Sequence, residues 1–171
     1  TKALIVNAGN ANAHTGIKGI KIIDKYVNSL SKFIGCKKSE ILVSSTGVIG
    51  EIFDPLLIIN KISKIKEKNK NSLLDAAKSI MTTDTYPKIS IRKFQIKNQI
   101  FKIYGIAKGS GMIQPNMATM LAYIFIEANI SNIILKKLIR NNIEDTFNAI
   151  SVDSDTSTSD TLMLFAINNN Q

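Results

Sequence analysis

The chain has 171 residues, a length typical of one domain, and its 44% hydrophobic and 20% charged residues are close to the average of globular proteins. No apolar run reaches the roughly 18 residues of a membrane span, and Thr1–Val6 lacks the features of a signal peptide, so we expect no membrane segment. The apolar run starts at Ala3. The chain thus enters a predicted strand almost at once, and we expect it to be part of a longer protein.

The formal net charge of +9 comes from 20 lysines but only 2 arginines, and tryptophan is absent. Proteins that read DNA or RNA rely on arginine for bidentate contacts and on aromatic rings for stacking. Isoleucine, lysine and asparagine make up 67 of the residues, and all three have AT-rich codons, so genome composition explains the excess of lysine. We therefore expect no nucleic-acid partner.

The single cysteine, Cys36, and the single histidine, His14, argue against a zinc site. A lone cysteine is typical of a reducing compartment, so we expect a cytoplasmic protein. The stretch from Asp153 begins like a calcium-binding loop, but Thr158 replaces the loop's glycine and Leu164 its bidentate glutamate. We expect no metal.

Hydrophobic periodicity and turn residues predict strands and helices that alternate without a strict βαβ order, and hence a mixed α/β fold. The expected elements, in chain order, are a strand at 3–7, a loop at 8–19, a helix at 20–34 ended by Gly35, a strand at 41–43, a helix from Asp54 to about 68, a helix at 73–81 behind a Ser72–Asp75 capping box, a hairpin of 89–94 and 100–106, a strand at 120–126 buried on both faces, a helix from Ser131 to about 142, and a strand at 162–167.

Thr119 opens the solidly apolar strand predicted at 120–126. A threonine hydroxyl is a nucleophile when a base takes its proton, and an N-terminal threonine uses its own α-amine, whose ordinary pKa of about 7.7–8.0 leaves part of it neutral in the cell. This requires cleavage of the bond between Ala118 and Thr119. A plain buried threonine is the alternative.

Five blocks of the chain, taken together, resemble the ornithine acetyltransferase family, the arginine-biosynthesis bifunctional proteins or glutamate N-acetyltransferases. They lie in the family's order and span nearly the whole chain. The resemblance implies part of an ornithine-acetyltransferase/DmpA-like self-processing fold. The blocks are NAGNANAHTG (7–16), LVSSTGVIGE (42–51), AAKSIMTTDTYPK (76–88), GIAKGSGMIQPNMATML (105–121) and TFNAISVDSDTSTSDT (146–161).

The resemblance implies an enzyme, an acyltransferase that cleaves itself between Ala118 and Thr119. The cut divides one partial domain, 1–171, into an α-chain part, 1–118, and a β-chain part, 119–171. Thr119 would then take the acetyl group of N2-acetylornithine and pass it to glutamate.

By the same resemblance, Thr46 and Gly47 form the oxyanion hole, and Thr82, Lys108 and Thr119 bind substrate. A backbone N–H or hydroxyl can stabilise the oxyanion of acyl transfer, and a lysine can meet the carboxylate that both substrates carry.

The family further implies a heterotetramer of two α and two β chains and no cofactor. Acetyl-CoA as a second donor separates bifunctional from monofunctional members, and no residue decides this point. Two rival interpretations remain, a truncated and inactive piece of the enzyme and a related self-cleaved peptidase with an N-terminal nucleophile.

Overall fold

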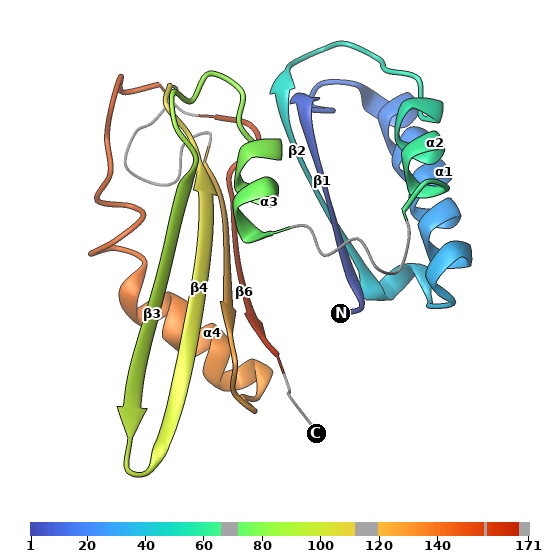
Figure 1. Cartoon of the computed structure of the whole chain (residues 1–171). Coiled ribbons are helices and arrows are strands. Elements are labelled where there is room, and N and C mark those ends of the chain that lie inside the picture. The colour runs from blue at the N-terminus through green and yellow to red at the C-terminus, as the bar shows by residue number, and fades with distance from the viewer. Residues whose placement is uncertain (66–71, 112–119, 156, 168–171) are drawn as a thin grey trace. The chain divides into compact units, whose positions relative to one another are not determined.

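The computed structural model describes residues 1–65, 72–111, 120–155 and 157–167, and it shows alternating helices and strands (Figure 1). The expected mixed α/β class is confirmed. The chain divides into two compact units, Thr1–Asn71 and Ser72–Gln171, and each is described by itself. Within the described ranges, no helix is long and apolar enough to cross a membrane.

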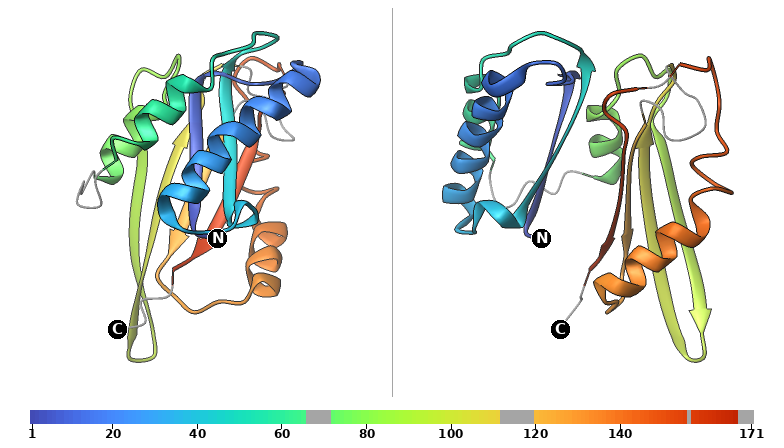
Figure 2. Two further views of the ribbon diagram at one scale, coloured as in Figure 1. Left: turned by 90° about the vertical axis from the view of Figure 1, so that its right-hand side faces the viewer. Right: turned by 180° about the vertical axis from the view of Figure 1, so that it is seen from behind.

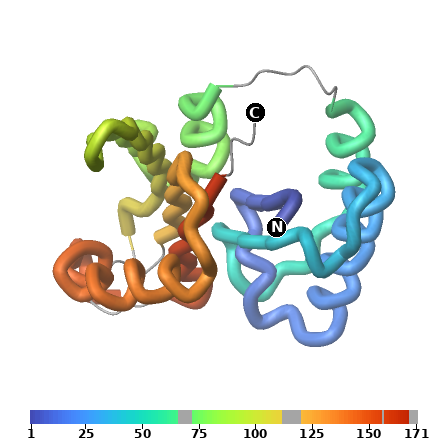
Figure 3. Tube along the Cα trace, turned by 90° about the horizontal axis from the view of Figure 1, so that it is seen from below, coloured from blue at the N-terminus to red at the C-terminus, as the bar shows by residue number. Residues whose placement is uncertain are grey.

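The first unit is built on two parallel strands, β1 (Ala3–Asn10) and β2 (Ile41–Val48), paired from their first residues onward. The helix α1 (Gly16–Ile34) and a short 3-10 turn, η1 (Lys38–Glu40), connect them, and α2 (Leu56–Ile62) follows β2. Parallel neighbours require such a crossover connection. Both helices lie on the same side of the strand pair (Figure 3).

The core of this unit is the apolar face of α1, where residues three or four apart lie one above the other. Gly35 ends α1 with a φ of 69°, as predicted, because a left-handed C-cap favours glycine. The buried cluster consists of Ile22, Tyr26, Val27, Leu30, Ile41 and Ile62.

Four predicted boundaries in this unit were wrong. The expected loop at 8–19 is strand as far as Asn10 and helix from Gly16, and the strand expected at 41–43 continues to Val48. Small residues suggested a loop, but here they let two parallel strands approach closely. The helix expected to reach about 68 ends at Ile62, and residues 66–71 lie outside the described part of the chain.

The second unit contains one four-stranded sheet of order β3-β4-β5-β6. The first two pairs are antiparallel, and β5 pairs with β6 in parallel. The elements are α3 (Leu73–Ser79), β3 (Lys88–Ile96), β4 (Gln99–Lys108), β5 (Leu121–Ile126), α4 (Asn132–Asn142) and β6 (Thr161–Ala166).

The strand β5 lies between β4 and β6, and its residues Leu121, Ala122 and Tyr123 are almost completely buried. The prediction of a central strand covered on both faces is therefore confirmed. The helix α4 runs across the strands (Figure 2), and its Leu138 and Ile139 line a small cavity with Leu162 of β6.

Local sequence signals in this unit were read correctly. The Ser72 hydroxyl accepts a hydrogen bond from the Asp75 N–H, and the Asp75 carboxylate accepts one from the Ser72 N–H, which is the predicted capping box. The hairpin of β3 and β4 turns at Lys97, whose φ is 53°. Ser131 caps α4.

Candidate active site

The Thr46–Gly47 pair lies near the end of β2 in the first unit. Gly47 has a φ of 127°, and a Cβ built there would lie 2.3 Å from the carbonyl carbon of Gly9 on β1. Because that neighbour is backbone and cannot move aside, only glycine fits at this position. Thr46 has no exposed surface, and its hydroxyl has no hydrogen-bond partner within the described residues.

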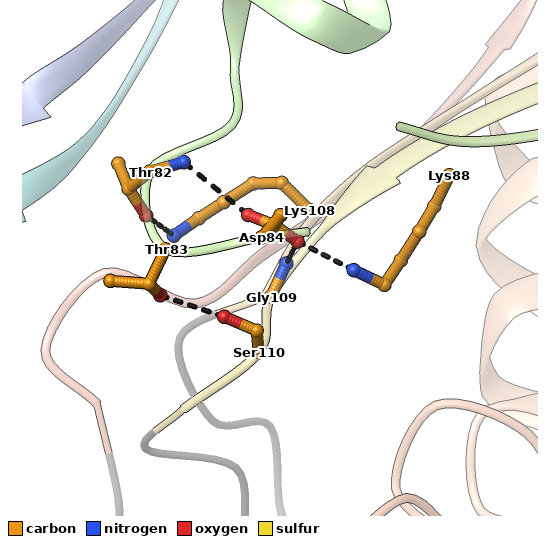
Figure 4. Close-up of polar contacts among 7 residues, drawn as sticks. All are labelled: Thr82, Thr83, Asp84, Lys88, Lys108, Gly109 and Ser110. Carbon is orange, nitrogen blue, oxygen red and sulfur yellow. Dashed lines mark hydrogen bonds and ion pairs between the residues drawn. The ribbon is translucent and has the colours of Figure 1, made fainter. Parts of the chain in front are cut away.

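The second unit holds a buried cation. Lys108 is the last residue of β4 and only 3% exposed. Its Nζ donates a 3.0 Å hydrogen bond to Thr82 Oγ1 (Figure 4). Thus two of the predicted substrate-binding residues, 26 positions apart in the chain, are in direct contact. The pKa of Lys108 lies below its ordinary value, mainly because burial disfavours the ammonium. The charge of Lys88 also lowers it, whereas the carboxylates of Asp84 and Asp160 raise it.

A buried carboxylate, Asp84, lies beside this pair, and its side chain has no exposed surface. Its Oδ1 accepts hydrogen bonds from Lys88 Nζ at 2.5 Å and from the Gly109 N–H at 2.8 Å, while Oδ2 accepts one from the Thr82 N–H at 3.3 Å. Burial alone would raise the pKa of Asp84, but these donors hold it below its ordinary value. The group therefore stays ionised.

A second contact joins the same two loops. The hydroxyls of Thr83 and Ser110 share a hydrogen bond of 2.7 Å. The turn after α3 and the end of β4 are thus connected through both side chains and backbone (Figure 4).

The start of β5 is fixed by another acid. Asp160 Oδ1 accepts a 2.8 Å hydrogen bond from the Met120 N–H, and the Met120 carbonyl accepts one of 2.9 Å from the Thr161 N–H. Lys108 faces Leu121 in the strand register, so the buried lysine and Asp160 flank the same end of β5. Burial raises the pKa of Asp160, although the Met120 N–H and the Lys108 charge lower it.

The predicted cleavage site, Ala118 and Thr119, lies outside the described residues, so its predicted role stays a prediction. Thr46 and Gly47 belong to the first unit, and Thr82 and Lys108 to the second. Among the described residues, no group of histidine, cysteine, aspartate or glutamate side chains could hold a metal ion.

Sequence reasoning assigned no role to Asp84, Lys88 or Asp160. All three lie inside the family-like blocks. An acid and a lysine four residues apart in a block of small and hydroxyl-bearing residues were the available signal. It was missed because the contact between Asp84 and the Gly109 N–H depends on the approach of a distant strand.

The model of the ArgJ family matches residues 1–171. Over 166 residues the chain is 46% identical to the arginine biosynthesis bifunctional protein ArgJ of Bartonella henselae. The match covers 96% of this chain and 40% of that protein. Over 165 residues it is 47% identical to the protein of the same name from Nitrobacter winogradskyi, with the same coverage.

The crystal structure of the arginine biosynthesis bifunctional protein ArgJ from Bacillus halodurans matches with a TM-score of 0.61 and 35% identity, covering 67% of this chain and 61% of that one. The fold is therefore part of the mixed α/β fold seen there. With the match over its whole length, the chain belongs to the ArgJ family. This confirms the resemblance drawn from the five blocks. The chain spans about 40% of the length of the curated relatives it matches.

Proposed function

We propose that this chain takes part in arginine biosynthesis as an acyltransferase that moves an acetyl group from N2-acetylornithine to glutamate through an acetyl-Thr119 intermediate. The observation that carries the proposal is the buried Lys108 ammonium bonded to the Thr82 hydroxyl. Both substrates carry a carboxylate, and a buried cation needs an anionic partner to offset its lost hydration. Membership of the ArgJ family supports the same reaction.

The proposed reaction is preceded by hydrolysis of the Ala118–Thr119 bond, in which water adds to the Ala118 carbonyl carbon, leaving a carboxylate on Ala118 and a free α-amine on Thr119. That amine accepts the proton of the Thr119 hydroxyl, and the oxygen attacks the acetyl carbon of N2-acetylornithine. The bond from acetyl carbon to ornithine nitrogen then breaks, and the proton passes to the leaving amine. In the second half, the amine of glutamate attacks the acetyl ester, and the Thr119 oxygen regains its proton.

In this scheme Thr46 and Gly47 supply the donors for the tetrahedral oxyanion. The unpartnered Thr46 hydroxyl supports this role, because a buried donor without a partner is costly in the folded protein and is satisfied when an oxyanion accepts its hydrogen bond. Removing one such donor typically costs about 2.7–4 kcal/mol of transition-state stabilisation. Thr82 and Lys108 bind the substrate carboxylate, and no cofactor enters.

We further propose a cytoplasmic protein that assembles as two α and two β chains. The free thiol of Cys36 supports a reducing compartment. An assay with acetyl-CoA in place of N2-acetylornithine tests whether the protein uses a second acetyl donor. Release of CoA in the presence of glutamate would make the protein bifunctional, and its absence would make it monofunctional.

Intact mass and a transfer assay with N2-acetylornithine and glutamate test the main proposal. The unchanged protein should give two pieces separated before Thr119 and show ping-pong kinetics, whereas Thr119→Ala should stay uncleaved and inactive. Cleavage or activity in Thr119→Ala would contradict the mechanism. A folded but uncleaved and inactive unchanged chain would favour the truncated piece, and amide hydrolysis without transfer to glutamate would favour the peptidase.

A further inference from the structure

The Asp84 carboxylate touches the backbone beside both members of the Lys108–Thr82 pair. One oxygen accepts the N–H of Gly109, the residue after Lys108, and the other accepts the N–H of Thr82 itself. A single rigid group thus joins the turn after α3 to the end of β4. Hydrogen bonds to a charged acceptor are stronger than neutral ones. Asp84 therefore restricts the backbone of both segments beside the Lys108 ammonium.

The charges around Asp84 are divided between two lysines. Lys88 Nζ donates directly to Asp84 and neutralises it, whereas Lys108 Nζ donates to Thr82. Among the described residues, Thr82 is the one acceptor to which the Lys108 ammonium donates a hydrogen bond. An ammonium has three donors, so Lys108 keeps donors for an incoming anion while Asp84 is already satisfied.

We propose that Asp84 is a positioning residue for carboxylate binding, which holds Lys108 and Thr82 in contact while Lys88 prevents it from capturing the Lys108 ammonium. The inference rests on the proposed function, since it assigns the pair to the carboxylate of glutamate and N2-acetylornithine. Asp84 itself does not touch the substrate in this scheme. Its effect passes through the Thr82 and Gly109 backbone.

The first test is Asp84→Asn in the purified protein, with KM and kcat measured separately for both substrates. We expect KM for each to rise about tenfold or more, the value of a lost hydrogen bond to a charged group, while kcat changes less than threefold. The control is Asp24→Asn, which removes the exposed Asp24–Lys38 ion pair of the other unit and should change neither constant. A folded Asp84→Asn protein with unchanged KM would overturn the inference.

The second test uses Lys88→Met and the double variant with Asp84→Asn. Lys88→Met leaves Asp84 charged and without its counter-ion, so the carboxylate should attract Lys108 and raise KM. Removing the carboxylate as well should relieve that part of the defect, and the two effects should therefore be non-additive. Additive effects on KM would mean that the two residues act independently, which contradicts the assignment.

A third readout does not depend on acetyl transfer. The pKa of Lys108 can be followed by NMR of ¹³C-labelled lysine, with its signal assigned from the loss of that signal in Lys108→Met. The charged groups that face Lys108 are Asp84, Lys88 and Asp160. Asp84→Asn should lower the pKa of Lys108, because it removes an anion and leaves Lys88 unneutralised. An unchanged pKa would overturn the inference even in a protein that transfers no acetyl group, whereas loss of transfer alone would count against the proposed function only.

Discussion

Asp160 and Met120 are 40 residues apart in the chain, yet the Asp160 carboxylate accepts the Met120 backbone N–H at 2.8 Å. Met120 directly follows Thr119 in sequence, so this contact fixes the backbone on the downstream side of the proposed nucleophile. Because β5 and β6 are parallel and begin in register at Leu121 and Thr161, the residues before each strand meet at the same edge of the sheet.

We expect Asp160→Asn to slow both cleavage and acetyl transfer, by about tenfold, because an amide oxygen is a weaker acceptor than a carboxylate. The effect should appear in the rate of appearance of the two pieces by intact mass. Asp155→Asn, an exposed acid in the preceding loop, is the matched control. Equal cleavage rates in Asp160→Asn and the unchanged protein would show that the contact has no part in the reaction.

Asp160 should also affect the pH dependence of stability. Its pKa is raised in the folded state, so its contribution to stability is complete below the ordinary aspartate pKa and is lost as the pH rises through the folded value. Thermal unfolding of Asp160→Asn should therefore lack one component of the decline that the unchanged protein shows as the pH rises from about 4.

Lys108→Met should weaken substrate binding without destabilising the fold. Burial lowers the pKa of Lys108, which means that holding its ammonium in the folded protein costs stability. An apolar side chain of similar length removes that cost, so we expect an unchanged or higher Tm together with a KM for glutamate raised by about tenfold or more. Lys102→Met, which removes a partly exposed lysine near Glu127, should leave KM unchanged. A large fall in Tm for Lys108→Met would contradict this account.

Thr46→Val should separate stability from catalysis in the first unit. Valine keeps the shape of threonine and removes a buried hydroxyl that has no partner among the described residues, so the free energy of unfolding should stay the same or rise. Loss of an oxyanion donor should reduce kcat by about 10²–10³. Chemical denaturation and the transfer assay measure the two effects. A variant with full kcat would remove Thr46 from the oxyanion hole.

Gly47→Ala should unfold the first unit at lower denaturant concentration. The added Cβ would meet the Gly9 backbone at 2.3 Å, and the φ of 127° is unfavourable for alanine, so we expect a loss of about 2–4 kcal/mol. Gly105→Ala is the matched control in a strand, because its Cβ would have only the Ser90 carbonyl oxygen at 4.0 Å and its φ is not positive. Comparable losses in the two variants would contradict the close approach of β1 and β2.

The sequence was most informative where signals are local. The Ser72 capping box, the Gly35 end of α1 and the hairpin that turns at Lys97 depend on neighbouring residues, and all three were predicted correctly. The extent of β1 and β2 was underestimated, because small residues carry no periodic pattern and their pairing is decided by the partner strand.

The candidate site also contains residues that the sequence predicted and residues that it did not. Lys108 and Thr82 were identified through the family blocks, and the structure brings them together. Asp84 and Asp160 could not be assigned from spacing, because their partners Gly109 and Met120 are main-chain groups 25 and 40 residues away. A backbone N–H looks the same in every sequence, so only the folded sheet shows which one an acid accepts.

The parallel pairing of β5 and β6 has a consequence for the order of events during synthesis. Met120 leaves the ribosome 40 residues before Asp160, and β3, β4 and β5 can form their antiparallel ladder in that interval. The carboxylate that holds Met120 arrives only with β6. A chain released before residue 160 would contain the proposed cleavage site and the buried lysine but not the acid that accepts the Met120 N–H at the start of β5. If the proposed cleavage needs a fixed start of β5, it can take place only after β6 has been added to the sheet.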